Sequence, residues 1–85
     1  MNTIFLLMAE FKSPILQIDD VAPKYFNINS EKKYKMMAAA NELPIAFFKA
    51  TDSRKGTWLC HVQDLANHID TRRAAANDEF EKSNR

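Results

Sequence analysis

The side chains suited to catalysis or metal binding are few and closely spaced. Cys60 and His61 are adjacent, and His68 follows in the same part of the chain. A thiol beside an imidazole could act as a nucleophile with its base, or supply two ligands to zinc. Neighbouring residues of a strand point to opposite faces, however, and a zinc site needs three or four ligands. We therefore expect no metal, no cofactor and no enzymatic activity.

A different chemistry, the binding of phosphate, is available to basic side chains in the middle of the chain. The formal net charge is only +1, but residues 24–55 carry +4, against −2 before them and −1 after them. Such a segment can form a surface that faces a polyanion. Lysines on a helix are nevertheless often just a solvated face, and basic turns often serve solubility. The candidate contacts are Asn29, Ser30, Lys32, Lys33, Lys35, Arg54 and Lys55.

A helix from residue 30 to 42 must position most of these residues. Ser30 is a good N-cap, and strong helix formers follow it. Leu43–Pro44 is expected to stop the helix, because the residue before a proline avoids helical geometry. At 3.6 residues per turn, the face expected to pack carries Tyr34, Met37, Ala38 and Asn41. The face expected to meet a partner carries Lys32, Lys35, Ala39 and Glu42.

A shorter helix is predicted before this one, with the segment 27–29 as the turn between them. Asp19 or Asp20 can serve as its N-cap. With Asp20 in that role, Pro23 falls in the first turn, where its missing N–H costs little. The side chains that this helix would bury are Val21, Ala22, Tyr25 and Phe26.

A β-hairpin is predicted after the second helix, with strands over 45–49 and 58–62. The polar loop Ala50–Thr57 joins them, and Gly56 gives it the backbone freedom that a turn needs. Arg54 and Lys55 then lie at the hairpin tip. The aromatic residues of the strands could stack on bases, but we expect them to pack in the core instead; they are Phe47, Phe48 and Trp58.

Residues 63–81 are predicted to form a closing helix whose apolar positions recur at helical spacing. These positions are Leu65, Ile69, Ala76 and Phe80. Arg72 and Arg73 lie between them, and we expect one of the two to form a salt bridge with Asp70 or Asp78.

The start of the chain, residues 1–12, contains an apolar run from Ile4 to Ala9 that is too short to span a membrane. It also lacks the basic region and cleavage site of a signal peptide. We interpret it as a buried strand or a docking segment. The composition, 46% hydrophobic and 27% charged, is typical of a folded protein, so we expect residues 1–85 to form one domain. A lone cysteine requires no oxidising compartment, which favours the cytoplasm.

The order of these elements predicts an α+β, mostly α fold: a small winged helix-turn-helix with a two-stranded β-hairpin wing. In such folds the second helix enters the major groove of double-stranded DNA, and the wing touches the flanking backbone. Lys32 and Lys35 would then project toward phosphates or base edges. Asn29 and Ser30 could bind phosphate at the helix N-terminus.

Several segments also resemble those of the pyocin activator (PrtN) family and, more distantly, of excisionase and MerR-like winged-helix proteins. They are Thr3–Ala9, Tyr25–Phe26, Leu43–Pro44, Ser53–Gly56 and Asp64–Ala76. The resemblance implies a bacterial or phage activator of bacteriocin or prophage-type genes, with RNA polymerase as an eventual partner.

Two other functions fit the same pattern. An excisionase-like architectural factor would bend DNA and assemble a recombinase. A protein-interaction module would instead use its apolar surfaces, by adding the segment 3–11 to a partner or by seating a partner helix on the C-terminal stripe. A homodimer through the N-terminal segment or the C-terminal helix is a further hypothesis.

Overall fold

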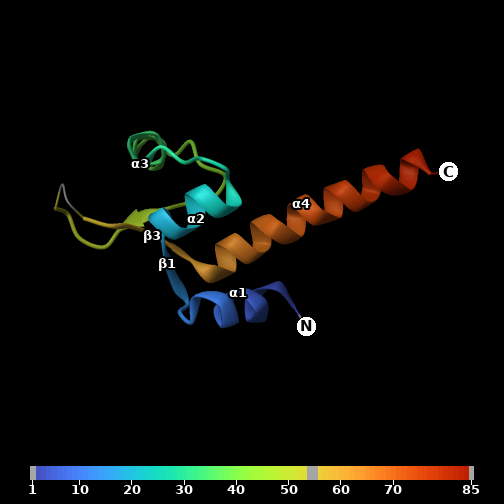
Figure 1. The fold of residues 1–85 in the computed structure, drawn as a ribbon, viewed down its shortest axis with the longest axis horizontal. Helices are drawn as coiled ribbons and strands as arrows, with labels where there is room; N and C mark the ends of the chain where they lie inside the picture. The colour runs from blue at the N-terminus through green and yellow to red at the C-terminus, as the bar shows by residue number, and fades with distance from the viewer. Residues whose placement is uncertain (1, 54–55, 85) are drawn as a thin grey trace.

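The computed structural model describes residues 2–53 and 56–84 of the chain. The described residues form a small α+β fold that is mostly helical and winged-helix-like, as predicted (Figure 1). In chain order the elements are α1 (Thr3–Phe11), β1 (Ile15–Gln17), α2 (Ile18–Tyr25), α3 (Glu31–Ala39), β2 (Phe48–Lys49), β3 (Trp58–His61) and α4 (Val62–Ser83).

The N-terminal apolar segment forms α1, so the expected strand is wrong. Asn2 caps the helix by accepting the backbone N–H of Phe5 at 3.1 Å. Lys12 ends it in the left-handed conformation, with φ 58°. α1 packs along the first turns of α4, where the hydroxyl of Thr3 donates a hydrogen bond to Asp70. The segment therefore docks within its own chain.

The sheet has three antiparallel strands in the order β1–β3–β2, one more than the predicted wing. The unpredicted strand, β1, pairs Leu16 with Cys60, while β2 pairs Phe48 with Leu59. The first strand of the hairpin is shorter than the predicted 45–49. Phe47 is buried as expected, but Phe48 is 48% exposed, so its predicted core position is wrong.

Helix α2 begins at Ile18, before the aspartates that were expected to cap it. Ile18 is completely buried, and the two aspartates occupy the first turn, where they suit the helix dipole. Pro23 consequently lies inside the helix and not in its first turn. The helix buries Val21 and Ala22 as predicted. Asn27, just beyond it, turns the chain with φ 56°.

Helix α3 ends at Ala39, before the predicted boundary at residue 42. Asn41 adopts a left-handed φ of 57°. The N–H of Asn41 donates to the carbonyl of Ala38 at 3.2 Å, and the N–H of Glu42 donates to the carbonyl of Met37 at 2.9 Å. This pair of bonds is a Schellman motif, which satisfies the last carbonyls of the helix. The helix therefore stops without help from Pro44.

Helix α4 spans 22 residues, and its two halves differ in environment. Leu65 and Ala66 are buried in the core and Ile69 is partly buried, whereas residues 70–84 are all exposed. The helix extends to the opposite end of the molecule from α3 and the β2–β3 hairpin, so the domain measures 53 × 26 × 17 Å (Figure 1).

The charges of α4 are not paired as predicted. Asp70 accepts from Thr3, and Asp78 pairs with Lys82 at 3.0 Å. Among residues 2–53 and 56–84, Arg72 and Arg73 form no ion pair. No helix in that part of the chain is both long enough and apolar enough to cross a bilayer.

Candidate nucleic-acid interface

The orientation of α3 is fixed by the side chains that it buries. Tyr34 and Ala38 are 4% and 3% exposed, and they seat the helix against the core. The hydroxyl of Tyr34 also donates a hydrogen bond to the carboxylate of Asp19 in α2. The pKa of Tyr34 is raised to about 12, chiefly by this hydrogen bond and secondly by burial of the phenol. The two helices are thus joined by a contact that sets which residues of α3 face outward.

The predicted contacts at the start of α3 lie together on the surface. Ser30 is the N-cap, as predicted, and its Oγ accepts the backbone N–H of Lys33 at 3.3 Å. Asn29, Lys32 and Lys33 are exposed beside it. The first turn of α3 therefore combines two exposed positive charges with the positive end of the helix dipole, the arrangement that favours anions.

Lys35, predicted to face a partner together with Lys32, is differently placed. It is partly buried and forms an ion pair with Glu31, one turn earlier, at 2.5 Å. The hydrogen bond to Glu31 raises the pKa of Lys35. The position next to the buried face explains the difference, because residue 35 follows Tyr34 by only 100° around the helix. Lys35 therefore already has an ionic partner within the domain.

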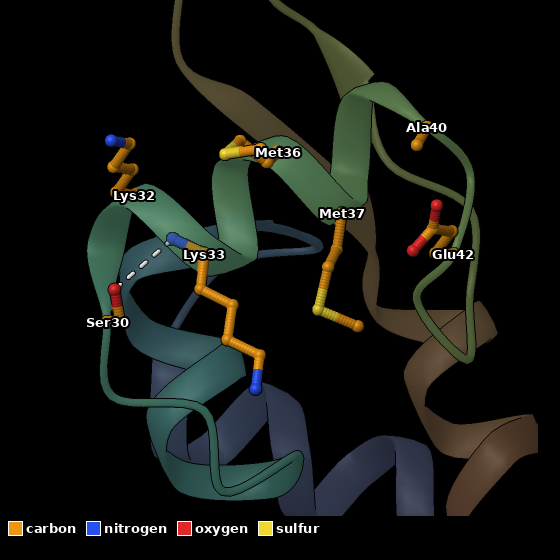
Figure 2. A pocket seen from close by; sticks show the side chains of 7 residues that line it. All are labelled: Ser30, Lys32, Lys33, Met36, Met37, Ala40 and Glu42. Atoms are coloured by element: carbon orange, nitrogen blue, oxygen red, sulfur yellow. Dashed lines mark hydrogen bonds between the residues drawn. The ribbon is translucent and has the colours of Figure 1, made fainter.

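Met36, which the sequence prediction omitted, lies on the outward side of α3 and is 62% exposed. It borders an open hollow of about 340 Å³ (Figure 2). In Figure 2, Lys32 and Met36 lie along the upper side of α3, and Lys33 and Met37 point downward beside it. The remaining lining residues are Ser30, Ala40 and Glu42. Residues 32 and 36 are one turn apart, on the side of the helix opposite to the packed residue Tyr34. This spacing is the sequence signal that indicates the outward face.

The wing carries a basic side chain that was also not predicted. Lys49 lies over the ring of Trp58, its cross-strand partner, with Nζ 5.5 Å from the ring centroid. Its ammonium also donates to the carbonyl of Ser53 at 3.2 Å. The strand ends are joined by the hydrogen bond from Ala50 to Thr57 at 3.0 Å. The predicted contacts Arg54 and Lys55 lie outside the described residues.

The residues considered for catalysis are separated by the fold. Cys60 is completely buried on the inner side of β3, whereas His61 is exposed and caps α4 by accepting the N–H of Gln63 at 2.9 Å. His68 is partly buried and packs edge-on against Phe26, with ring centroids 5.6 Å apart. All three side chains have structural roles.

Comparison with known proteins identifies the family of the chain. The family model described as pyocin activator protein PrtN matches residues 3–76 of the 85-residue chain. The chain belongs to the pyocin activator family. No curated protein and no solved structure matches it. Because the match runs from α1 through the exposed middle of α4, it covers every element that positions the surface of α3. The pyocin activator family consists of regulatory activators, so membership indicates a role in activating transcription.

Proposed function

We propose that this pyocin activator family member binds double-stranded DNA in a sequence-specific manner and thereby activates bacteriocin or prophage-type genes. In this proposal α3 enters the major groove, and the β2–β3 hairpin contacts the neighbouring backbone. The observation that carries it is the exposed first turn of α3. Lys32, Lys33 and the backbone N–H groups beside Ser30 present positive charge there.

The remaining outer face of α3 supplies a means of reading bases. Phosphate contacts position a protein on DNA but carry no sequence information, which comes from the base edges. Met36 is exposed in the middle of the helix, and the small side chains of Ala39 and Ala40 are exposed beyond it. Apolar side chains in the major groove contact the 5-methyl group of thymine. We therefore assign Met36 to base contact, and Lys32 and Lys33 to the backbone.

The position of α3 within the molecule leaves the rest of the surface available for other partners. α3 and the hairpin lie at one end, and α4 extends to the other (Figure 1). A protein bound to DNA through α3 would keep the surface away from α3 and the hairpin accessible to RNA polymerase, the partner that an activator needs. Such a protein would act in the bacterial cytoplasm, where both are present.

The test is a fluorescence anisotropy titration against duplex DNA from upstream of the neighbouring genes, at two salt concentrations and with scrambled duplex as competitor. Binding that weakens steeply with salt and survives the competitor is the expected result. Absence of binding at low salt would overturn the proposal. Binding that the scrambled duplex abolishes would retain DNA binding but remove sequence specificity.

A further inference from the structure

The C-terminal part of α4 projects from the domain; together with its C-cap Asn84 it spans residues 70–84, and we call this segment the overhang. All of its residues are exposed, including Phe80 at 68%. The contacts of α4 with α1 end near its beginning, where Thr3 meets Asp70. The apolar stripe that seats α4 on the core thus continues past the core through Ala76 to Phe80.

An isolated helix of this length has little stability of its own. Helices shorter than about 12 to 15 residues are marginal in water, because most helical stability in proteins comes from packing. Within the overhang the only ion pair among described residues joins Asp78 to Lys82, and an exposed pair at this spacing contributes little. A partner that covers the stripe would therefore stabilise the helix itself.

Asp70 of the overhang is bonded to Thr3 and Asp78 is paired with Lys82, and the remaining charged side chains are segregated along its length. Arg72 and Arg73 stand on the N-terminal side of Ala74–Ala76, and Glu79 and Glu81 stand on the C-terminal side. Neither arginine forms an ion pair within the described part of the chain, and Glu79 and Glu81 form none there either. Reversing the direction of the helix exchanges its positive half for its negative half. The overhang is therefore complementary to a second copy of itself, laid antiparallel.

We propose that the overhang is a homodimer interface in which two α4 helices cross antiparallel at Ala75 and Ala76. With the two-fold axis between Ala75 and Ala76, Arg72 faces Glu79 of the other copy, and Arg73 lies beside its Phe80. The small alanines allow the helix axes to approach closely, and the ring of Phe80 packs against the aliphatic part of the arginine. A contact of this kind is isologous, so each pairing occurs twice.

The first test is the mass of the full-length protein by light scattering over a range of concentrations and salt. The expected result is twice the chain mass of 9.8 kDa, falling toward the monomer as salt increases. A monomer at all concentrations would overturn the proposal. This readout does not involve DNA, so it stands or fails independently of the proposed function.

Charge reversal tests the antiparallel arrangement. The Arg72→Glu/Arg73→Glu variant and the Glu79→Arg/Glu81→Arg variant should each be monomeric, while an equimolar mixture should form heterodimers. Circular dichroism establishes that each variant keeps its helices. A mixture of the two variants that forms no heterodimer would contradict the antiparallel arrangement. A dimer that persists in both variants but dissociates in Leu6→Glu, which alters the exposed face of α1, would also contradict it.

Cross-linking tests the position of the axis. Ala76→Cys should form an intermolecular disulfide with its own copy under mild oxidation, since a disulfide requires Cα atoms within about 7 Å. Thr71→Cys, at an equally exposed position farther from the axis, is the matched control and should not cross-link. The native Cys60 does not interfere, because it is completely buried. Equal cross-linking at both positions would contradict the proposed axis.

Discussion

The phenol of Tyr34 in α3 donates a hydrogen bond to the carboxylate of Asp19 in α2. This contact links the two helices of the helix-turn-helix across a turn that contains no glycine. Tyr34 is also among the buried side chains that seat α3 on the core. One residue therefore sets both the tilt of α3 relative to α2 and the face that α3 presents.

Removing this hydroxyl should destabilise the domain. Tyr34→Phe keeps the ring but leaves Asp19 without its donor, and hydrogen bonds to charged groups contribute about 1.5–3 kcal/mol. Because Asp19 is exposed and can bind water instead, we expect a loss of about 1–2 kcal/mol in the free energy of unfolding, measured by urea denaturation. Tyr25→Phe, which removes the exposed bond to Glu10, is the control and should cost less. Equal losses would argue against a special role for Tyr34.

The same bond should make stability depend on alkaline pH. The pKa of Tyr34 is raised from 10.0 to about 12 in the folded state, chiefly by the hydrogen bond to Asp19. The folded state therefore holds the phenol proton more tightly than the unfolded state. This contribution is complete below pH 10 and is lost as pH rises toward 12. The slope of stability against pH in this range should be steeper for the native protein than for Tyr34→Phe.

The lysines of α3 should differ in their effect on DNA binding. Lys32→Ala should weaken binding to all sequences and reduce the slope of log K against log salt by about 1, since one phosphate contact is lost. Lys35→Ala should change the slope much less, because the charge of Lys35 is already paired with Glu31. Anisotropy titrations over a salt series measure both slopes. A larger effect at Lys35 would mean that the ion pair opens when DNA binds.

The affinity that Met36 contributes to DNA binding should depend on thymine methyl groups. Replacing a contacted thymine by deoxyuridine removes one methyl group, worth about 0.8 kcal/mol when buried, or roughly fourfold in affinity. The Met36→Ala variant should bind the two duplexes equally, which makes the pair of substitutions a double-mutant cycle. If every thymine in the site can be replaced without loss, Met36 does not contact a methyl group.

Cys60 should resist thiol reagents in the folded protein. It is completely buried, and burial raises the pKa of its thiol to about 12, so almost no thiolate is present near neutral pH. Labelling should proceed only through opening of the sheet, and addition of urea should accelerate it. The unfolded protein provides the reference rate. Labelling of the folded protein at that rate would show that β3 opens readily.

The elements that could be predicted from the sequence are those with local signals. Ser30 followed by strong helix formers indicated α3, and the stripe beginning at Leu65 indicated α4. Strand β1 and helix α1, which were missed or assigned wrongly, lack such signals. Strand β1 exists because it pairs with β3, and its short sequence shows no alternation that could have revealed it. The apolar run of α1 fits a strand as well as a helix, and only the capping by Asn2 distinguishes them.

The candidate site was predicted in part for the same reason. Ser30 and Lys32 follow from the start of the helix, whereas the outward position of Met36 depends on how Tyr34 packs. The pairing of Lys35 with Glu31 agrees with their i, i+4 spacing in the sequence. Arg72 and Arg73 were expected to find partners along their own helix, but Thr3 and Lys82 occupy the acidic groups that they could have used.

The left-handed residues Lys12, Asn27 and Asn41 affect the entropy that the domain loses when it binds a partner. Each lies just after a helix, and none is glycine, so the joints that follow α1, α2 and α3 have few alternative conformations. A domain with stiff joints presents α3 at one angle before any partner arrives. The domain then loses little conformational entropy when it binds, and any change of shape occurs in the partner.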